Sequence, residues 1–435
     1  MVGGLGQLGA ERALAQFADR ATHDEISTDK RNPNRNANGL IYGSPEESRD
    51  YLPVLDPVHN TIAQVKVPYR DADTPGQPKP LQPSNIRGDE SIWDSHTAVH
   101  NPMFDECGRV WYTARIRAGE NPAYCKAGSA LISAKLTPVA TSGRQLSVYD
   151  PATKKTETID TCFATHHLLF ASDANNTLWT SSGGGGVVGW LNTKVWDQTH
   201  DPAKSQGWTA LVLDTNGNGK RDPYVDNEQS VVTAPSGESL GISSAVNPKG
   251  DNTKDTRLNA AFYALAIGPD GMIWGSGHLA SFDRRKCKGP LNGPAATGQQ
   301  CPEGWTLYPS PGPNFKNVTD SGSADSHYYD WVDQFDTLGL GKNTPIATGN
   351  SSDSLLALVT PVNTRNGKWV VLRVPYPLGF FAKGMDGRID DPKAGWKGKG
   401  VWTTWGTRTP FHSETGKGAN SKVVHFQIRP DPLAD

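Results

Sequence analysis

Three segments of the chain repeat one pattern of apolar and polar positions. Each begins with a ring-bearing residue, alternates apolar and polar positions as far as a turn, and resumes with an apolar stretch that carries a tryptophan. Such alternation is typical of half-buried strands, and a polar turn between two of them predicts a β-hairpin. The three segments are residues 100–113, 167–180 and 263–276.

A second, shorter module follows each copy of the first. It is an apolar strand that ends in Asp or Asn at a turn, and it occupies residues 145–151, 188–192 and 278–283. Residues 51–57 match this second module without a clear first half. Two hairpins per unit, repeated along the chain, describe the four-stranded blade of a β-propeller.

The sequence therefore predicts an all-β protein, a β-propeller of five to seven four-stranded blades with long loops between strands; a β-sandwich is the alternative. Helix formers at the N-terminus predict a short helical segment over 1–22. The remaining residues, 23–435, are expected to form a single propeller domain. Polar stretches predict insertions in this domain near 115–142, 214–258 and 284–326.

Composition agrees with a blade-based fold and excludes some partners. The chain has 435 residues, and its 46 glycines and 32 prolines favour many turns. Its formal net charge is −2 and it has no long basic stretch, which argues against a nucleic-acid partner. No apolar run approaches the roughly 18 residues of a membrane-spanning helix.

The five cysteines suggest an oxidising location. Cys287 and Cys301 flank a loop rich in Gly, Pro and Asn, so a disulfide that closes this loop is expected. Cys125 can pair with Cys162 or with Cys107, and free core cysteines are the alternative. A disulfide framework favours a periplasmic or secreted protein. No signal peptide is visible in the sequence, so a cytoplasmic location stays open.

A calcium loop is predicted within the second insertion. Asp214, Asn216, Asn218 and Asp222 place oxygen-bearing side chains at loop positions 1, 3, 5 and 9, with a glycine at position 6. That spacing wraps a loop around a hard cation such as Ca²⁺. Val225 stands where the usual acidic residue at position 12 is expected, and a plain Asn-Gly turn is the alternative.

The repeat also brings candidate catalytic residues together. The innermost strands of a propeller meet at its centre, and His100, His167 and Tyr263 open the three repeated segments. Imidazoles on separate blades can bind a metal, either Mg²⁺ or a transition metal, or one of them can act as a general base. His166 is a further candidate ligand, and histidines that only hydrogen-bond neighbouring blades are the alternative.

An acidic partner for these histidines is expected near the N-terminus. His23, Asp24 and Glu25 are adjacent, and Glu25 is a candidate metal ligand if this segment crosses the centre. Neighbouring residues of a strand point to opposite faces, so at most two of the three can share one site. A solvated turn is the alternative interpretation.

The repeat resembles the virginiamycin B lyase (streptogramin lyase) family. The spacing from His100 to Trp111 matches the blade signature of that family, and Tyr263 to Trp274 has the same spacing; the distance from His167 to Trp179 is one residue longer. The resemblance covers about half of the chain. It implies a seven-bladed propeller that opens a cyclic ester by elimination, with Mg²⁺ and central His and Glu side chains.

The resemblance carries only part of that family's site over to this chain. The family's catalytic histidines stand at the blade start, which implies His100 and His167. Its acidic groups lie three residues beyond the blade tryptophan, where this chain has Ala114, Ser182 and Gly277. None of these can bind Mg²⁺ or act as a base, so cleavage of streptogramins themselves is not expected.

Two functions follow from the sequence. The first is a metal-assisted lyase or hydrolase that acts on ester-like or lactone-like small molecules. The second is a non-catalytic binding or scaffold propeller that presents its loops to a glycan, a peptide or a protein. The sequence indicates no oligomeric state.

Overall fold

The computed structural model describes the chain in several stretches. Two of them are long: residues 24–71, without 33, 38, 47 and 48, and residues 95–210, without 137 and 183–186. The others are 212–213, 218, 224–226, 231–233, 239–242, 255–257, 263–275, 280–287, 304–308, 327–349 without 335, 354–359, 368–373, 381–388, 400–406 and 422–426. The helix predicted over 1–22 lies outside these residues.

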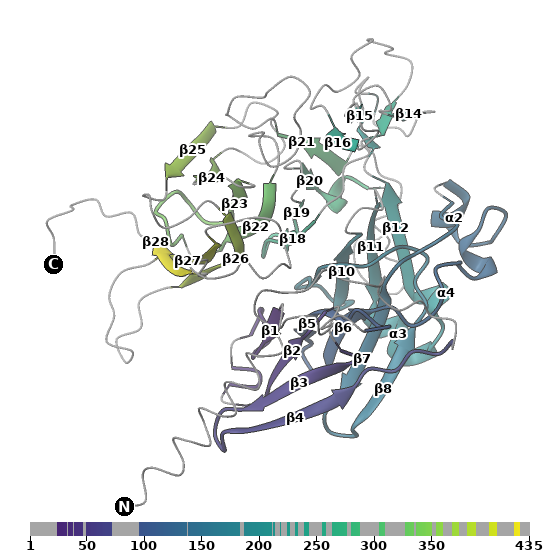
Figure 1. Ribbon diagram of the computed structural model, residues 1–435. Coiled ribbons are helices and arrows are strands. Elements are labelled where there is room, and N and C mark those ends of the chain that lie inside the picture. Colours follow the sequence, from purple (N-terminus) through teal and green to yellow (C-terminus); the bar gives the residue numbers. More distant parts are fainter. Residues whose placement is uncertain are drawn as a thin grey trace, which may run out of the picture. The chain divides into compact units, whose positions relative to one another are not determined.

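The described residues form mostly antiparallel sheets, which confirms the predicted fold class. Five sheets have four strands each, joined in the order of the chain, and this is the arrangement of a propeller blade (Figure 1). A sixth sheet of the same meander type has three strands. These sheets agree with the five to seven blades predicted from the repeat.

Contacts divide the chain into two compact units. The first comprises Met1–Gly185 and Gly189–Trp208, and the second comprises Gly186–Val188 and Thr209–Asp435. His100 and His167 lie in the first unit, and Tyr263 lies in the second.

The first unit contains three blades, apart from two residues in each of the last two strands of the third blade. Their strands are β1 (Asp24–Ile26), β2 (Ile41–Ser44), β3 (Tyr51–Asp56) and β4 (Thr61–Lys66); β5 (His100–Phe104), β6 (Val110–Ala114), β7 (Gln145–Asp150) and β8 (Lys155–Ile159); and β9 (Leu168–Phe170), β10 (Thr177–Ser181), β11 (Val187–Asn192) and β12 (Gln206–Ala210). The first strands of neighbouring blades lie beside each other, β1 beside β5 and β5 beside β9. The starts of these strands are therefore brought together.

The short helices of the first unit lie in connections between strands. They are η1 (Ala123–Cys125), α2 (Ile132–Leu136), α3 (Thr193–Thr199) and α4 (Pro202–Ser205). The side chain of Asn192 accepts the backbone N–H of Val195 and so caps α3 at the end of β11. Among the described residues, no helix is both long and apolar enough to cross a bilayer.

Large side chains fill the space between blades. Trp111 and Phe170 are buried, and their rings meet edge to face at 6.1 Å between the second and third blades. Tyr42 and Phe104 make the same kind of contact at 5.7 Å between the first and second blades. Such aromatic pairs add about 0.5–1.5 kcal/mol beyond the burial of their area.

Aspartates explain the turns of the repeat. Asp105 follows β5, and its carboxylate accepts the backbone N–H groups of Cys107 and Arg109 and the indole N–H of Trp111. Asp173 holds the corresponding turn after β9 by accepting from Thr177. The repeated sequence pattern therefore corresponds to one type of β-hairpin, with an aspartate that stabilises its turn, and this hairpin occurs in successive blades.

The second module ends in the same kind of turn. The carboxylate of Asp56 accepts the backbone N–H groups of Val58 and His59, and that of Asp150 accepts the N–H of Ala152. These bonds satisfy backbone groups where the third strand of a blade turns into the fourth.

One predicted half-blade is completed by a segment that the apolar pattern does not reveal. Residues 51–57 show no clear first half in the sequence, yet β1 and β2 pair with each other and β2 pairs with β3. β1 has three residues, and only Ile26 is apolar and buried. A strand this short and polar has too few positions for an alternation to be visible.

A disulfide links two connections in the first unit. Cys125 and Cys162 are both buried, with their Cα atoms 5.1 Å apart. This is one of the two pairings expected for Cys125, and Cys107 is exposed and free. Cys287 is also disulfide-bonded, whereas Cys301, its expected partner, lies outside the described residues.

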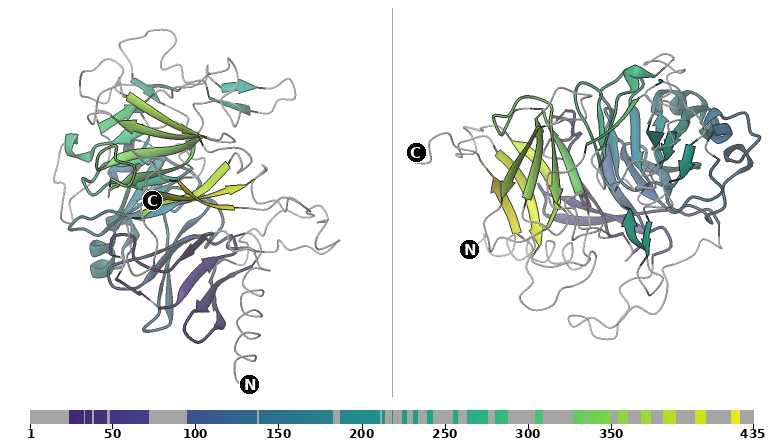
Figure 2. Two further views of the ribbon diagram at one scale, coloured as in Figure 1. Left: turned by 90° about the vertical axis from the view of Figure 1, so that its left-hand side faces the viewer. Right: turned by 90° about the horizontal axis from the view of Figure 1, so that it is seen from above.

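The second unit contains two more four-stranded sheets, a three-stranded sheet and small additional sheets. The four-stranded sheets are β18 (Leu265–Ile267), β19 (Ile273–Gly275), β20 (Ala280–Phe282) and β21 (Trp305–Leu307), and β22 (His327–Asp333), β23 (Thr344–Gly349), β24 (Ser354–Val359) and β25 (Lys368–Arg373). Figure 2 shows the green strands of the latter sheet next to one another. The three-stranded sheet is β26 (Phe381–Arg388), β27 (Gly400–Gly406) and β28 (Lys422–Phe426), and the remaining elements are β13 (Val212–Leu213), β14 (Tyr224–Asp226), β15 (Val231–Thr233), β16 (Ser239–Ile242), β17 (Asp255–Arg257) and the helix η3 (Arg284–Lys286).

The predicted calcium loop lies almost wholly outside the described residues. Of its four candidate ligands only Asn218 is described, and it is exposed. Calcium binding there stays a prediction.

A buried carboxyl group stands on the first strand of one blade in the second unit. Asp330 of β22 is 7% exposed, and neither of its carboxylate oxygens has a hydrogen-bond partner in the part of the chain that the structure describes. Burial raises its pKa well above the ordinary value of an aspartate. By contrast Asp333, at the end of the same strand, accepts the backbone N–H groups of Thr337 and Leu338.

Replacement of Asp330 by Asn should change how stability depends on pH. At pH values between the ordinary and the raised pKa, Asp330 is deprotonated in the unfolded chain and protonated in the folded chain. The free energy of unfolding of the wild type should therefore fall by about 1.4 kcal/mol per pH unit in that window, relative to Asp330→Asn. Urea unfolding at a series of pH values measures the difference, with Glu25→Gln, an exposed carboxyl, as the control. Parallel pH profiles for wild type and Asp330→Asn would contradict the assignment.

Candidate metal centre

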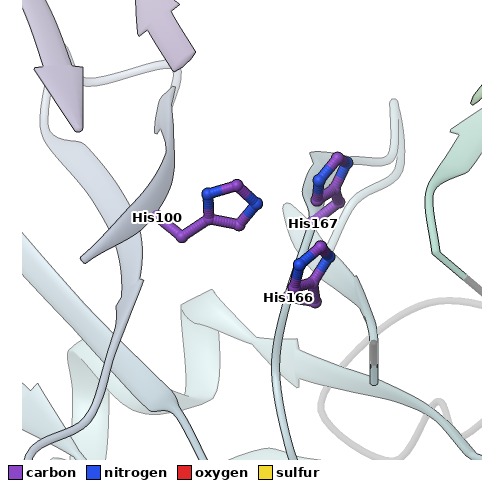
Figure 3. Close-up of side chains that lie close together, drawn as sticks. All are labelled: His100, His166 and His167. Carbon is purple, nitrogen blue, oxygen red and sulfur yellow. The ribbon is translucent and has the colours of Figure 1, made fainter. Parts of the chain in front are cut away.

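Three buried histidines meet in the first unit. One ring nitrogen from each of His100, His166 and His167 can be chosen so that all three lie within 4.8 Å of one another. The residues are 0%, 9% and 4% exposed, respectively. Figure 3 shows the ring of His100 pointing toward the other two imidazoles.

The three histidines come from two neighbouring blade starts. His100 is the first residue of β5, and His166 and His167 directly precede Leu168, the first residue of β9. The ring centroid of His100 lies 4.5 Å from that of His166 and 4.9 Å from that of His167. The rings of His166 and His167 are stacked, with an angle of 7° between their planes. The side chains of the adjacent residues His166 and His167 can lie on the same side of the backbone because both residues precede the regular strand β9.

One hydroxyl group joins the two blade starts. The side-chain oxygen of Thr113, in β6, lies 3.1 Å from the backbone carbonyl of His100 and 3.1 Å from that of His166. The side chain of Asn101 accepts the backbone N–H of Leu168 at 2.6 Å and ties the same segments together. These contacts hold the backbone of both blade starts in place, and the Cα atoms that carry the three imidazoles are therefore fixed relative to one another.

The backbone around His100 is strained. Ala98 and Asn101 have φ angles of +43° and +47°, in the left-handed region that L-residues other than glycine rarely adopt. The preceding segment is held by Asp50, whose carboxylate accepts the backbone N–H of Thr97 at 2.8 Å and the hydroxyl of Ser95 at 2.6 Å. Strain of this kind is concentrated at functional sites, where the surrounding structure enforces it.

Acidic groups lie on one side of His100. Oδ2 of Asp24 is 3.1 Å from Nδ1 of His100, and Oε1 of Glu46 is 3.8 Å from the same nitrogen. Oε1 of Glu46 also accepts a hydrogen bond from Nη2 of Arg144 at 2.7 Å. Nε of Arg144 donates a hydrogen bond to the carbonyl group of Ala98. Glu46 and Arg144 cancel in formal charge, which leaves Asp24 and one net negative charge beside three imidazoles.

Some predicted site residues lie elsewhere. Glu25 is exposed, because it lies on the face of β1 opposite Asp24 and Ile26. Tyr263 lies in the second unit, where its ring meets that of Tyr329 at 5.9 Å. Their roles stay predictions.

Sequence reasoning missed two members of this environment. Glu46 lies between β2 and β3, and its backbone forms an isolated bridge with Val99. Arg144 precedes β7. Both stand in polar connecting segments, and no periodicity or motif in such segments marks a residue that contacts a site far away in the sequence.

Comparisons with known proteins give no family for this chain. No protein-family model matches it, and no curated protein matches it. The comparisons do not confirm the streptogramin lyase resemblance.

Solved structures resemble the chain only distantly. The allergen Mala s 1 of Malassezia sympodialis is 9% identical, with 88% of this chain and 86% of that chain covered and a TM-score of 0.40. An α-L-arabinofuranosidase of Fusarium graminearum is 9% identical, with 92% and 91% covered and a TM-score of 0.36. A proposed 6-phosphogluconolactonase of Bacteroides fragilis is 9% identical, with 93% and 82% covered and a TM-score of 0.36. Nothing about the activity of this chain follows from similarities of this size.

The hydroxyl of Thr113 should contribute measurably to stability. Thr113→Val keeps the shape of the side chain but removes the single O–H donor that the two buried carbonyl groups share, and a cost of about 1–3 kcal/mol is expected. Urea unfolding followed by tryptophan fluorescence measures it. Thr61→Val, at an exposed position of β4, is the matched control. If Thr113→Val were as stable as the wild type, the hydroxyl would not join the blade starts in the way described.

Proposed function

We propose that this chain is a metal-assisted hydrolase or lyase that acts on ester-like or lactone-like small molecules. The observation that carries the proposal is the buried cluster of His100, His166 and His167. Three imidazoles are a common ligand set of catalytic zinc sites, which keep a further position open for water or substrate. Imidazole nitrogen suits zinc and other transition metals better than Mg²⁺ or Ca²⁺.

The charges around the cluster support a divalent cation. Three neutral imidazoles and the Asp24 carboxylate carry one net negative charge, once Glu46 and Arg144 have cancelled. A divalent ion would bring this group to one net positive charge. Three buried imidazolium groups would instead repel one another in a medium that solvates charge poorly.

Metal binding requires a small rearrangement of the rings. An imidazole ligand holds its metal close to the plane of its ring, and the stacked rings of His166 and His167 have nearly parallel planes. One of the two must turn about its χ2 torsion, which is soft for histidine. Ligand nitrogens around a tetrahedral zinc lie roughly 3.3 Å apart, so the cluster must also contract slightly.

The bound metal would polarise a carbonyl group and lower the pKa of a water molecule. The residues of this chain would hold and orient it. His100 is fixed by Thr113 and by the strained backbone on both sides, and Asp24 faces its other side. An imidazole that is not engaged with the metal can take or return a proton during the reaction. The reaction class, ester hydrolysis or elimination, depends on the substrate.

A structural metal is the second candidate, and burial favours it. The three imidazoles are almost wholly removed from solvent, and a metal there would join the second and third blades. The chain would then be the binding or scaffold propeller that the sequence left open. In that case metal would raise stability and no ester or lactone would be turned over.

Export to an oxidising compartment, the periplasm or the cell exterior, is part of the proposal. The Cys125–Cys162 disulfide supports it, because such bonds are rare where thiols are kept reduced.

Metal binding tests the proposed function. The purified chain, stripped with a chelator, should bind about one Zn²⁺ or Co²⁺ ion in calorimetric titration. His167→Ala should weaken binding by more than about 100-fold, since loss of a supporting group outside the ligand set already costs 10–100-fold. His59→Ala, an exposed histidine in the turn between β3 and β4, is the control and should bind as the wild type does.

Turnover separates the catalytic from the structural metal. Metal-loaded wild type should hydrolyse or open members of a panel of aryl esters and lactones, and His167→Ala should not. Equal metal affinity in wild type and His167→Ala would contradict the site, whereas tight binding without turnover of any ester or lactone would favour the structural metal.

A further inference from the structure

We infer that Asp24 is the positioning carboxylate of this centre: it holds the proton of His100 on Nδ1 and so presents Nε2 to the metal. The inference rests on the proposed function and names a residue that acts through His100. Oδ2 of Asp24 lies 3.1 Å from Nδ1 of His100, the distance of an ion pair, although the ring N–H is not aligned with the carboxylate as a hydrogen bond requires. A turn of the ring about its soft χ2 torsion, as metal binding also requires for one of the neighbouring imidazoles, would bring the two groups into line.

The local structure of β1 explains why Asp24 has this place. Asp24 is the first residue of β1, as His100 is the first residue of β5, and the two strands lie beside each other. β1 pairs with β2 in antiparallel register, with Asp24 opposite Ser44. Because side chains alternate along a strand, Asp24 shares its face with buried Ile26, and Glu25 points to solvent. The first blade thus contributes a carboxylate where the next two contribute imidazoles.

Asp24 fits a position outside the set of metal ligands. The cluster of potential ligand atoms comprises the three histidines alone within the described part of the chain. The carboxylate instead approaches Nδ1, one of the two nitrogens of His100, and Figure 3 shows the ring extending from its backbone toward His166 and His167. Metal-binding histidines usually donate their second ring N–H to a carboxylate or a carbonyl, which fixes the tautomer and makes the ligand nitrogen more basic.

Glu46 is less suited to this role. Its Oε1 is 3.8 Å from Nδ1 of His100, beyond hydrogen-bond distance, and 2.7 Å from Nη2 of Arg144. Arg144 is in turn anchored on the carbonyl of Ala98. A carboxylate held by an arginine is a weaker acceptor for the imidazole, so Asp24 is the group that acts on His100.

Affinity for Co²⁺ tests the inference. Asp24→Ala should bind Co²⁺ about 10–100-fold more weakly than the wild type, the range found for groups that support metal ligands. Asp24→Asn keeps an oxygen acceptor and loses the charge, so its affinity should fall between the two. Glu120→Ala, which removes an exposed carboxylate of the same unit, is the control and should bind as the wild type does. Wild-type affinity in Asp24→Ala would overturn the role of Asp24.

The tautomer of His100 gives a readout that does not depend on metal. In metal-free protein with ¹⁵N-labelled histidine, the NMR signals of His100, assigned by their loss in His100→Gln, should report a proton on Nδ1. Asp24→Ala should shift this population toward the other tautomer, and Glu120→Ala should leave it unchanged. A protein that binds no metal but shows this shift would overturn the proposed function and keep the contact; an unchanged tautomer in Asp24→Ala would overturn the inference.

Discussion

A four-stranded blade has two faces to cover, and the middle blade of the first unit packs against a neighbouring blade on each side. This constraint places the first strands of consecutive blades side by side, β1 beside β5 and β5 beside β9. Residues at the starts of these strands then come together although they are far apart in the sequence. Asp24, His100 and His167 meet for this reason, and the polar cluster follows from the packing of the sheets.

The turns keep this packing in register. Asp105 and Asp173 lie at the turn of the first hairpin in two blades. Asp56 and Asp150 lie at the turn of the second hairpin in two blades. Each carboxylate satisfies backbone N–H groups that a turn would otherwise leave without partners. The tryptophan that follows the turn, such as Trp111, then lies buried between neighbouring sheets.

Much of the fold was predictable because it rests on local patterns. Alternation and turn residues mark the blades that begin at His100 and His167, and they identify both histidines as blade-start residues. The partners of these histidines were harder to predict, because β1 has one buried apolar residue and Glu46 lies in a connection. Their positions depend on strand pairing and on the packing of neighbouring blades, which no short sequence pattern records. His166 joins the cluster because it precedes the regular strand, where the alternation rule for neighbouring side chains does not apply.

The central claim is that His100, His166 and His167 bind one transition metal ion. X-ray absorption spectroscopy of the zinc-loaded protein tests it most directly, because the spectrum reports the number, distance and type of the ligands. The claim predicts three imidazole nitrogens at about 2.0–2.1 Å, with the multiple-scattering pattern of histidine rings. A spectrum with oxygen ligands only, without imidazole scattering, would contradict it.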